Sequence, residues 1–296
     1  MLFNKKHQKN LLRLVSLFSV IRGYNIIVLV AALYLTARYI LAPDLRWMDL
    51  LLDGSFFCLV LASALTSASG YIINNFFDAA KDQINRPRKF LLEHLVSQQS
   101  QLVLYLLLNM AVLFFASVIS FKAVLLFSLY IFSIWLYSSY IKRWFWLSNL
   151  FSVLLTILPF WIITFYFKNF EVNIFYHALY LFLLLLIRDI VKDLENLKGD
   201  MIQQYQTLPS VFSAKLTKWI ITTIIASCLI PIYLLHHSSA GGMQLYFDLS
   251  LPFLALLLVL LWRANGQKMY LWLHNLLKFW ILVGVLCIAF MYKHGF

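Results

Sequence analysis

Long apolar stretches alternate with short polar segments along the whole chain, and nine of these stretches are long enough to cross a membrane as helices. A helix of roughly 20 apolar residues spans the hydrocarbon part of a bilayer. No stretch shows the alternating ten-residue pattern that is typical of a membrane β-barrel. The pattern therefore predicts an all-α membrane protein with nine transmembrane helices, at residues 16–37, 54–80, 100–120, 122–141, 146–167, 172–193, 216–235, 246–262 and 270–291.

The composition agrees with this prediction. Hydrophobic residues make up 62% of the chain and charged residues only 12%, which lies far outside the range of soluble proteins. We find no linker, low-complexity run or soluble appendage. The sequence thus predicts a single polytopic membrane domain over residues 1–296.

Basic residues are distributed unevenly between the two predicted sides of the membrane. With the N-terminus in the cytoplasm, the segments 81–99, 142–145, 194–215 and 263–269 become cytoplasmic loops, and that side collects 18 of the 24 Lys and Arg. Cytoplasmic loops of membrane proteins carry such an excess. We therefore expect a cytoplasmic N-terminus. We expect the positive net charge of +12 to interact with anionic lipid headgroups and phosphate substrates rather than with nucleic acid.

Acidic residues are rare and clustered, because six of only twelve lie in two short stretches at predicted cytoplasmic helix ends. In the first stretch, Asn74, Asp78 and Asp82 follow one another at intervals of four residues. On a helix this spacing places the three side chains in a stripe on one face. Carboxylate and amide oxygens are ligands for Mg²⁺, which also keeps waters and substrate phosphates. The stripe predicts a metal site, against the simpler alternative of a solvated helix end.

Basic residues follow the first stripe directly. Arg86 and Arg88 flank a proline, and Lys89 comes next. Guanidinium groups bind phosphate oxygens in a bidentate manner. Metal-binding carboxylates next to arginines therefore indicate a diphosphate site, although snorkelling basic side chains are the structural alternative.

The second stretch repeats this combination. Asp193, Asn196 and Asp200 are spaced by three and four residues, which predicts a second set of metal ligands, and Arg188 and Lys192 are candidates for phosphate binding. Glu195 points elsewhere on a regular helix, but it could join the ligands if the helix unwound at Gly199. Two such surfaces facing each other could hold both phosphates of a diphosphate.

These motifs resemble those of the UbiA superfamily of intramembrane prenyltransferases. The stripe of Asn74, Asp78 and Asp82 matches the first aspartate-rich motif of the family at every required position. The sequence from Arg188 to Asp200 is similar to the second motif of one branch of this family, and Thr207, Leu208 and Pro209 follow it. That branch includes (geranylgeranyl)glyceryl phosphate geranylgeranyltransferase. With nine predicted helices, the resemblance covers nearly the whole chain.

The chain departs from the family pattern at three places. The second motif usually has an aspartate where this chain has Asn196, which puts the second metal site in question. The family continues after the arginines into a Pro-Ser/Thr-Gly turn, whereas Lys89 begins a different sequence here. The family also commonly carries a tyrosine one turn before a lysine, and the resemblance implies that this pair binds substrate. Tyr137 and Lys142 match the pair only loosely, because they are five residues apart rather than four.

The resemblance implies Mg²⁺-dependent transfer of a prenyl group from an isoprenyl diphosphate to a small aromatic or lipid acceptor within a bacterial or archaeal cell membrane. The active site would lie on the cytoplasmic side, with Asp78, Asp82, Asp193 and Asp200 as catalytic residues. Terpenoid cyclisation and haem farnesylation on the same scaffold remain alternatives. A transporter is a third, although its acids would be expected at mid-membrane on broken helices.

Overall fold

The computed structural model describes residues 5–238 and 242–291, and the side chains from residue 11 onward. All regular elements in these ranges are helices, and nine candidate spans lie among them, which confirms the predicted number. The spans are α2 (Gly23–Thr36) with its π-helical extension η1 (Ala37–Leu41), α4 (Gly54–Asn85), α6 (Gln98–Ile119), α7 (Phe121–Ser139), α8 (Leu147–Phe167), α9 (Val172–Ile202), α11 (Ala214–Ser227) with α12 (Leu229–Ser238), α13 (Gly242–Arg263) and α14 (Gln267–Ile288). Shorter helices are α1 (Lys5–Val20), α3 (Trp47–Leu52), α5 (Pro87–Glu93), η2 (Ile141–Arg143) and α10 (Leu208–Val211).

The first span begins later than predicted. The sequence predicted a helix from residue 16, whereas the structure ends α1 at Val20 and begins α2 at Gly23. Arg22 has a positive φ of 50°, which interrupts the helix. The ring of Phe18 lies so close to Gly23 that a Cβ atom there would meet it at 2.1 Å, so a larger residue at this position would require the Phe18 side chain to move.

The two helices that carry the acidic motifs are longer than predicted. Helix α4 continues to Asn85 and α9 to Ile202, so both motifs lie entirely within helices. The predicted loops 81–99 and 194–215 therefore contain helical segments at their start, and the short helices α5 and α10 follow. Helix α4 ends where Pro87 begins α5, since a proline disfavours the helical conformation of the residue before it.

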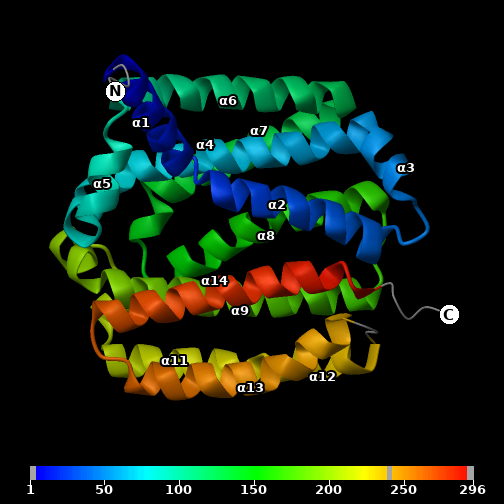
Figure 1. The fold of residues 1–296 in the computed structure, drawn as a ribbon. Helices are drawn as coiled ribbons and strands as arrows, with labels where there is room; N and C mark the ends of the chain where they lie inside the picture. The colour runs from blue at the N-terminus through cyan, green and yellow to red at the C-terminus, as the bar shows by residue number, and fades with distance from the viewer. Residues whose placement is uncertain (1–4, 239–241, 292–296) are drawn as a thin grey trace. The chain divides into compact units, whose positions relative to one another are not determined.

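The chain forms two compact units, and one consists of residues 1–30 and 53–140. Helix α4 lies at the centre of this first unit, where it packs against α6, α7 and α5 (Figure 1). Buried residues make up 61% of its apolar window, the highest share among the candidate spans. The first acidic motif is thus carried by the most enclosed helix.

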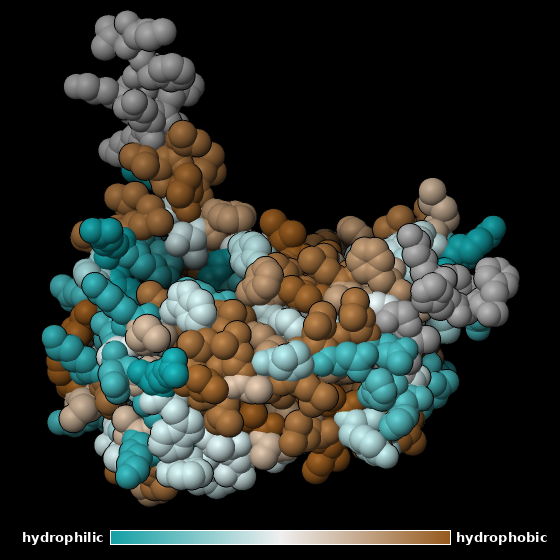
Figure 2. Space-filling view, turned by 60° about the horizontal axis from the view of Figure 1, so that its bottom comes forward, coloured by the Kyte–Doolittle hydropathy of each residue, from teal (hydrophilic) through white to brown (hydrophobic). Residues whose placement is uncertain are grey.

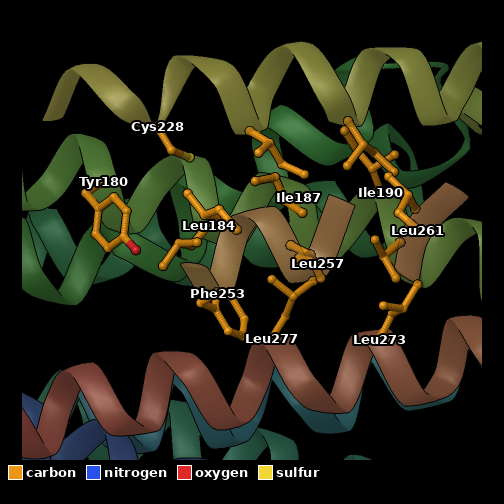
Figure 3. Packing of buried hydrophobic residues seen from close by; sticks show 14 of the residues in the cluster. Tyr180, Leu184, Ile187, Ile190, Cys228, Phe253, Leu257, Leu261, Leu273 and Leu277 are labelled. Carbon is orange, nitrogen blue, oxygen red and sulfur yellow. The ribbon is translucent and has the colours of Figure 1, made fainter. Parts of the chain in front are cut away.

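The second unit consists of residues 31–52 and 141–296. Helix α9 is its centre, packing against α14, α8, α12, α11 and α10. Leu184 and Ile187 of α9 point toward Leu257 of α13 and Leu277 of α14 in the core of this unit (Figure 3). With 50% of its apolar window buried, α9 has the second highest share of buried residues, so the second motif is also fixed on a central helix.

Many large hydrophobic side chains are exposed. They include Val103, Leu106, Met110 and Phe114 on α6, and Figure 2 shows extensive hydrophobic surface on the face in view. Soluble monomers rarely expose contiguous apolar areas of this extent. The exposed faces fit the hydrocarbon of a bilayer.

Candidate active site

The predicted stripe of the first motif lies on one continuous helix. Asn74, Asp78 and Asp82 are all within α4, so their side chains follow one another one turn apart. Asp78 is 8% exposed, and the other two are partly buried. A buried carboxylate requires a cation or hydrogen-bond donors to offset its desolvation.

Lys89 provides a cation to this stripe. Its Nζ donates to Asp82 Oδ2 at 3.0 Å and lies 3.4 Å from Glu93 Oε2, so one ammonium group bridges two carboxylates. The Glu93 side chain is only 2% exposed, whereas that of Lys89 is 26% exposed. Sequence reasoning named Lys89 among the basic residues but gave no role to Glu93. Since α5 is helical, the four-residue spacing of Lys89 and Glu93 was the available signal.

Glu93 belongs to a buried polar network that joins four helices of the first unit. Ser19 of α1 donates to Glu93 Oε1 at 3.1 Å, and Gln101 of α6 donates from Nε2 to the Glu93 carbonyl at 2.9 Å. Asn75 of α4 in turn donates to Gln101 Oε1 at 3.4 Å. Asn75 is thus a packing residue next to the stripe.

The two arginines after the first motif occupy the junction between α4 and α5. Arg86 is partly buried and ends α4, while Arg88 is exposed in the first turn of α5. The sequence predicted a loop here, but the backbone turns once at Arg86 and becomes helical again. Their assignment to phosphate binding stays a prediction.

Arg188 of the second motif is held by its neighbour. Its Nε and Nη2 donate to Asp189 Oδ1 at 3.1 and 2.8 Å, and Ser152 of α8 donates to Asp189 Oδ2 at 2.6 Å. Both oxygens of Asp189 thus accept hydrogen bonds from protein groups. Asp189 orients Arg188, which keeps a partly exposed guanidinium group suited to phosphate.

Asp193 is held in a similar way from α8. Asn149 Nδ2 donates to Asp193 Oδ2 at 2.7 Å, and Asn149 is 5% exposed. Sequence reasoning missed Asn149 and Ser152. Their spacing of three residues in a largely apolar helix was the signal, because it places both on one face.

The remaining predicted ligands of the second motif are buried more deeply than Asp193. Asp200 is 0% exposed and Asn196 4% exposed, and both lie on α9 because the helix continues through Gly199. Glu195 does not join them. Its Oε2 lies 2.7 Å from Nδ1 of His274 on α14, and both side chains are buried. The structure does not meet the condition under which Glu195 could join the metal ligands, because α9 continues through Gly199 and the Glu195 carboxylate contacts His274 of α14.

Three further predicted residues have definite places in the fold. Lys192 lies on α9 one turn after Arg188 and is partly buried, Tyr137 lies on α7 and is partly buried, and Lys142 is 8% exposed in η2. Their roles in substrate binding stay predictions.

The donor atoms of both motifs suit Mg²⁺ better than a softer metal. Asn74, Asp78 and Asp82 offer oxygen only, as do Asn196 and Asp200. Among the residues that the structure describes, no group of three or more His, Cys, Asp and Glu could hold a metal ion by itself.

Comparison with known proteins gives a consistent result. The model of the UbiA prenyltransferase family matches residues 25–270, which include both motifs. A digeranylgeranylglyceryl phosphate synthase of Sulfurisphaera tokodaii is 24% identical over 245 residues, which cover 82% of this chain and 85% of the relative.

Solved structures share the fold at low sequence identity. A UbiA homologue of Archaeoglobus fulgidus bound to GPP and Mg²⁺ superposes with a TM-score of 0.67 at 14% identity, over 93% of this chain and 99% of that chain. A structure of a digeranylgeranylglyceryl phosphate synthase gives a TM-score of 0.66 at 18% identity, over 93% and 97%.

Proposed function

Because this chain belongs to the UbiA prenyltransferase family, we propose that it transfers a prenyl group from an isoprenyl diphosphate to an acceptor lipid, with Mg²⁺ as cofactor. The two motif-bearing helices are the most enclosed spans of the chain, and Asp78 and Asp200 are nearly or fully buried on them. This burial of oxygen ligands on central helices is the observation that carries the proposal.

In the proposed reaction, the bond between the first carbon of the allylic chain and the diphosphate oxygen breaks, and the electron pair leaves with the diphosphate. A hydroxyl oxygen of the acceptor then forms a bond to that carbon and loses its proton. When bound, Mg²⁺ neutralises charge that develops on the leaving diphosphate. The ligands are Asn74, Asp78 and Asp82 in the first motif, with Asp193, Asn196 and Asp200 in the second.

Basic residues take the phosphate oxygens in this proposal. The guanidinium group of Arg188 is oriented before substrate binds, because it donates to Asp189, which in turn accepts a hydrogen bond from Ser152. Preorganised donors stabilise developing charge without reorganisation during the reaction. The others are Arg86, Arg88, Lys192 and Lys142, with Tyr137 as a further contact.

The names of the relatives narrow the proposed substrates. The relative from Sulfurisphaera tokodaii is a digeranylgeranylglyceryl phosphate synthase, which supports geranylgeranyl diphosphate as donor and a geranylgeranylglyceryl phosphate as acceptor. Such an acceptor is apolar at one end and anionic at the other. It would lie with its chain among the spans and its phosphate at the membrane surface.

We place the reaction at the cytoplasmic membrane surface. The basic residues that follow both motifs support this side, because positive charge accumulates in cytoplasmic segments. A cytoplasmic N-terminus belongs to the same proposal.

The experiment uses the full chain in purified membranes with labelled geranylgeranyl diphosphate, the glyceryl phosphate acceptor and Mg²⁺. We expect an ether lipid product by mass spectrometry and release of pyrophosphate, both lost when EDTA is added. Pyrophosphate release with a cyclic hydrocarbon and no acceptor requirement would establish a cyclase instead. An absence of pyrophosphate release under all conditions would refute prenyl transfer.

A further inference from the structure

The ammonium group of Lys89 donates a hydrogen bond to a carboxylate oxygen of Asp82, and the proposed function assigns that carboxylate to a divalent cation. Nζ lies 3.0 Å from Asp82 Oδ2, and a cation bound at that oxygen would compete with it for the same lone pairs. Lys89 has a second anionic partner in Glu93, at 3.4 Å. It can therefore leave Asp82 without becoming unpaired.

Glu93 is held more firmly than either of its neighbours. Its carboxylate accepts from Ser19, and Gln101 donates to its main-chain carbonyl. With 2% of its side chain exposed, against 15% for Asp82 and 26% for Lys89, it carries a charge that requires a cation nearby. Helices α1, α4, α5 and α6 of the first unit fix this arrangement (Figure 1).

From this geometry we propose that Lys89 is a positioning residue that keeps Asp82 in place without metal and moves entirely to Glu93 when a divalent cation binds Asp82. The ammonium group offsets repulsion between two neighbouring carboxylates, and the incoming cation takes over one of its two partners. Glu93 thus tunes the affinity of the first motif for metal without touching it. The inference rests on the proposed function because it assigns Asp82 to a cation.

Two substitutions separate this role from ordinary stabilisation, because they change metal affinity in opposite directions. Lys89→Met removes the competitor, so the Mg²⁺ concentration for half-maximal stabilisation should fall about two- to fivefold, the range of a partly exposed ion pair. Glu93→Gln leaves Lys89 with Asp82 as its single carboxylate partner, so the same midpoint should rise about two- to fivefold. A purely structural role would lower the melting temperature in both variants and leave the midpoint unchanged.

The measurement is thermal unfolding of the full chain in detergent, followed by tryptophan fluorescence, from EDTA through a series of Mg²⁺ concentrations without diphosphate. Lys89→Met should melt lower than wild type in EDTA and recover with Mg²⁺. Lys122→Met is the matched control, since Lys122 is an exposed lysine at the start of α7, and it should keep the wild-type midpoint.

The proposal is overturned if the midpoint of Lys89→Met equals or exceeds that of wild type, or if Glu93→Gln shifts it in the same direction. A series in which Mg²⁺ stabilises neither wild type nor Lys89→Met also overturns it. A wild-type enzyme that forms no prenylated product would defeat the proposed function, while these binding midpoints would still decide the role of Lys89.

Discussion

The buried pair of Glu195 and His274 gives a stability prediction that can be worked from the structure. Glu195 Oε2 and His274 Nδ1 are 2.7 Å apart, their side chains are 2% and 4% exposed, and they join the central helix α9 to α14. We consider His274→Ala, which removes the imidazole, and Glu195→Gln, which keeps a hydrogen-bonding group of the same size.

Removing the partner of a hydrogen-bonded buried carboxylate costs about 1.5 to 3 kcal/mol. We take the upper end, about 3 kcal/mol, for His274→Ala, because both side chains of the pair are buried. For the 296 residues of this chain, an unfolding entropy of about 2.1 cal/mol/K per residue converts this into a melting temperature lower by roughly 5 °C. Glu195→Gln retains the hydrogen bond and should cost about 1 kcal/mol, or less than 2 °C.

The assay is thermal unfolding in detergent by tryptophan fluorescence. His237→Ala is the matched control, because His237 is an exposed histidine at the end of α12 and should change stability by no more than about 0.5 kcal/mol. A change of 1 kcal/mol in stability should shift the melting temperature by about 1.6 °C. If the melting temperature of His274→Ala lies within about 1 °C of that of the control, the pair does not hold the two helices together.

Three further substitutions address the reaction. Asp78→Ala or Asp82→Ala should abolish pyrophosphate release while the melting curve stays cooperative; normal turnover by both would remove the first motif from the site. Asn196→Asp should lower the Mg²⁺ concentration for half-maximal activity, and an unchanged titration would mean that Asn196 is not a ligand. Asn149→Ala removes a hydrogen bond to the Asp193 carboxylate worth about 1.5 kcal/mol, so kcat/KM should fall about tenfold in a folded protein, whereas unchanged kinetics would separate Asp193 from catalysis.

The number of spans and the two motifs could be read from the sequence because they depend on local properties. Length and apolarity alone decide whether a segment can cross the hydrocarbon, and nine such segments were found where the structure has them. The spacing of Asn74, Asp78 and Asp82 likewise depends only on the 3.6-residue period of one helix.

Helix ends were less predictable, and the reason is physical. The predicted spans end where the apolar stretches end, at about residues 80 and 193, but the helices α4 and α9 continue to Asn85 and Ile202. A polar residue outside the hydrocarbon does not stop a helix; a proline does, as at Pro87.

The distant partners of the acidic residues were decided by tertiary structure alone. His274 lies 79 positions from Glu195 along the chain, Asn149 lies 44 from Asp193, and Ser19 lies 74 from Glu93. Local spacing places each carboxylate on a face of its own helix, but only packing selects the helix that meets that face. Charges removed from water must find donors wherever the fold brings them, so the sequence by itself determined which carboxylates share a helix face and the tertiary structure decided which groups hold them.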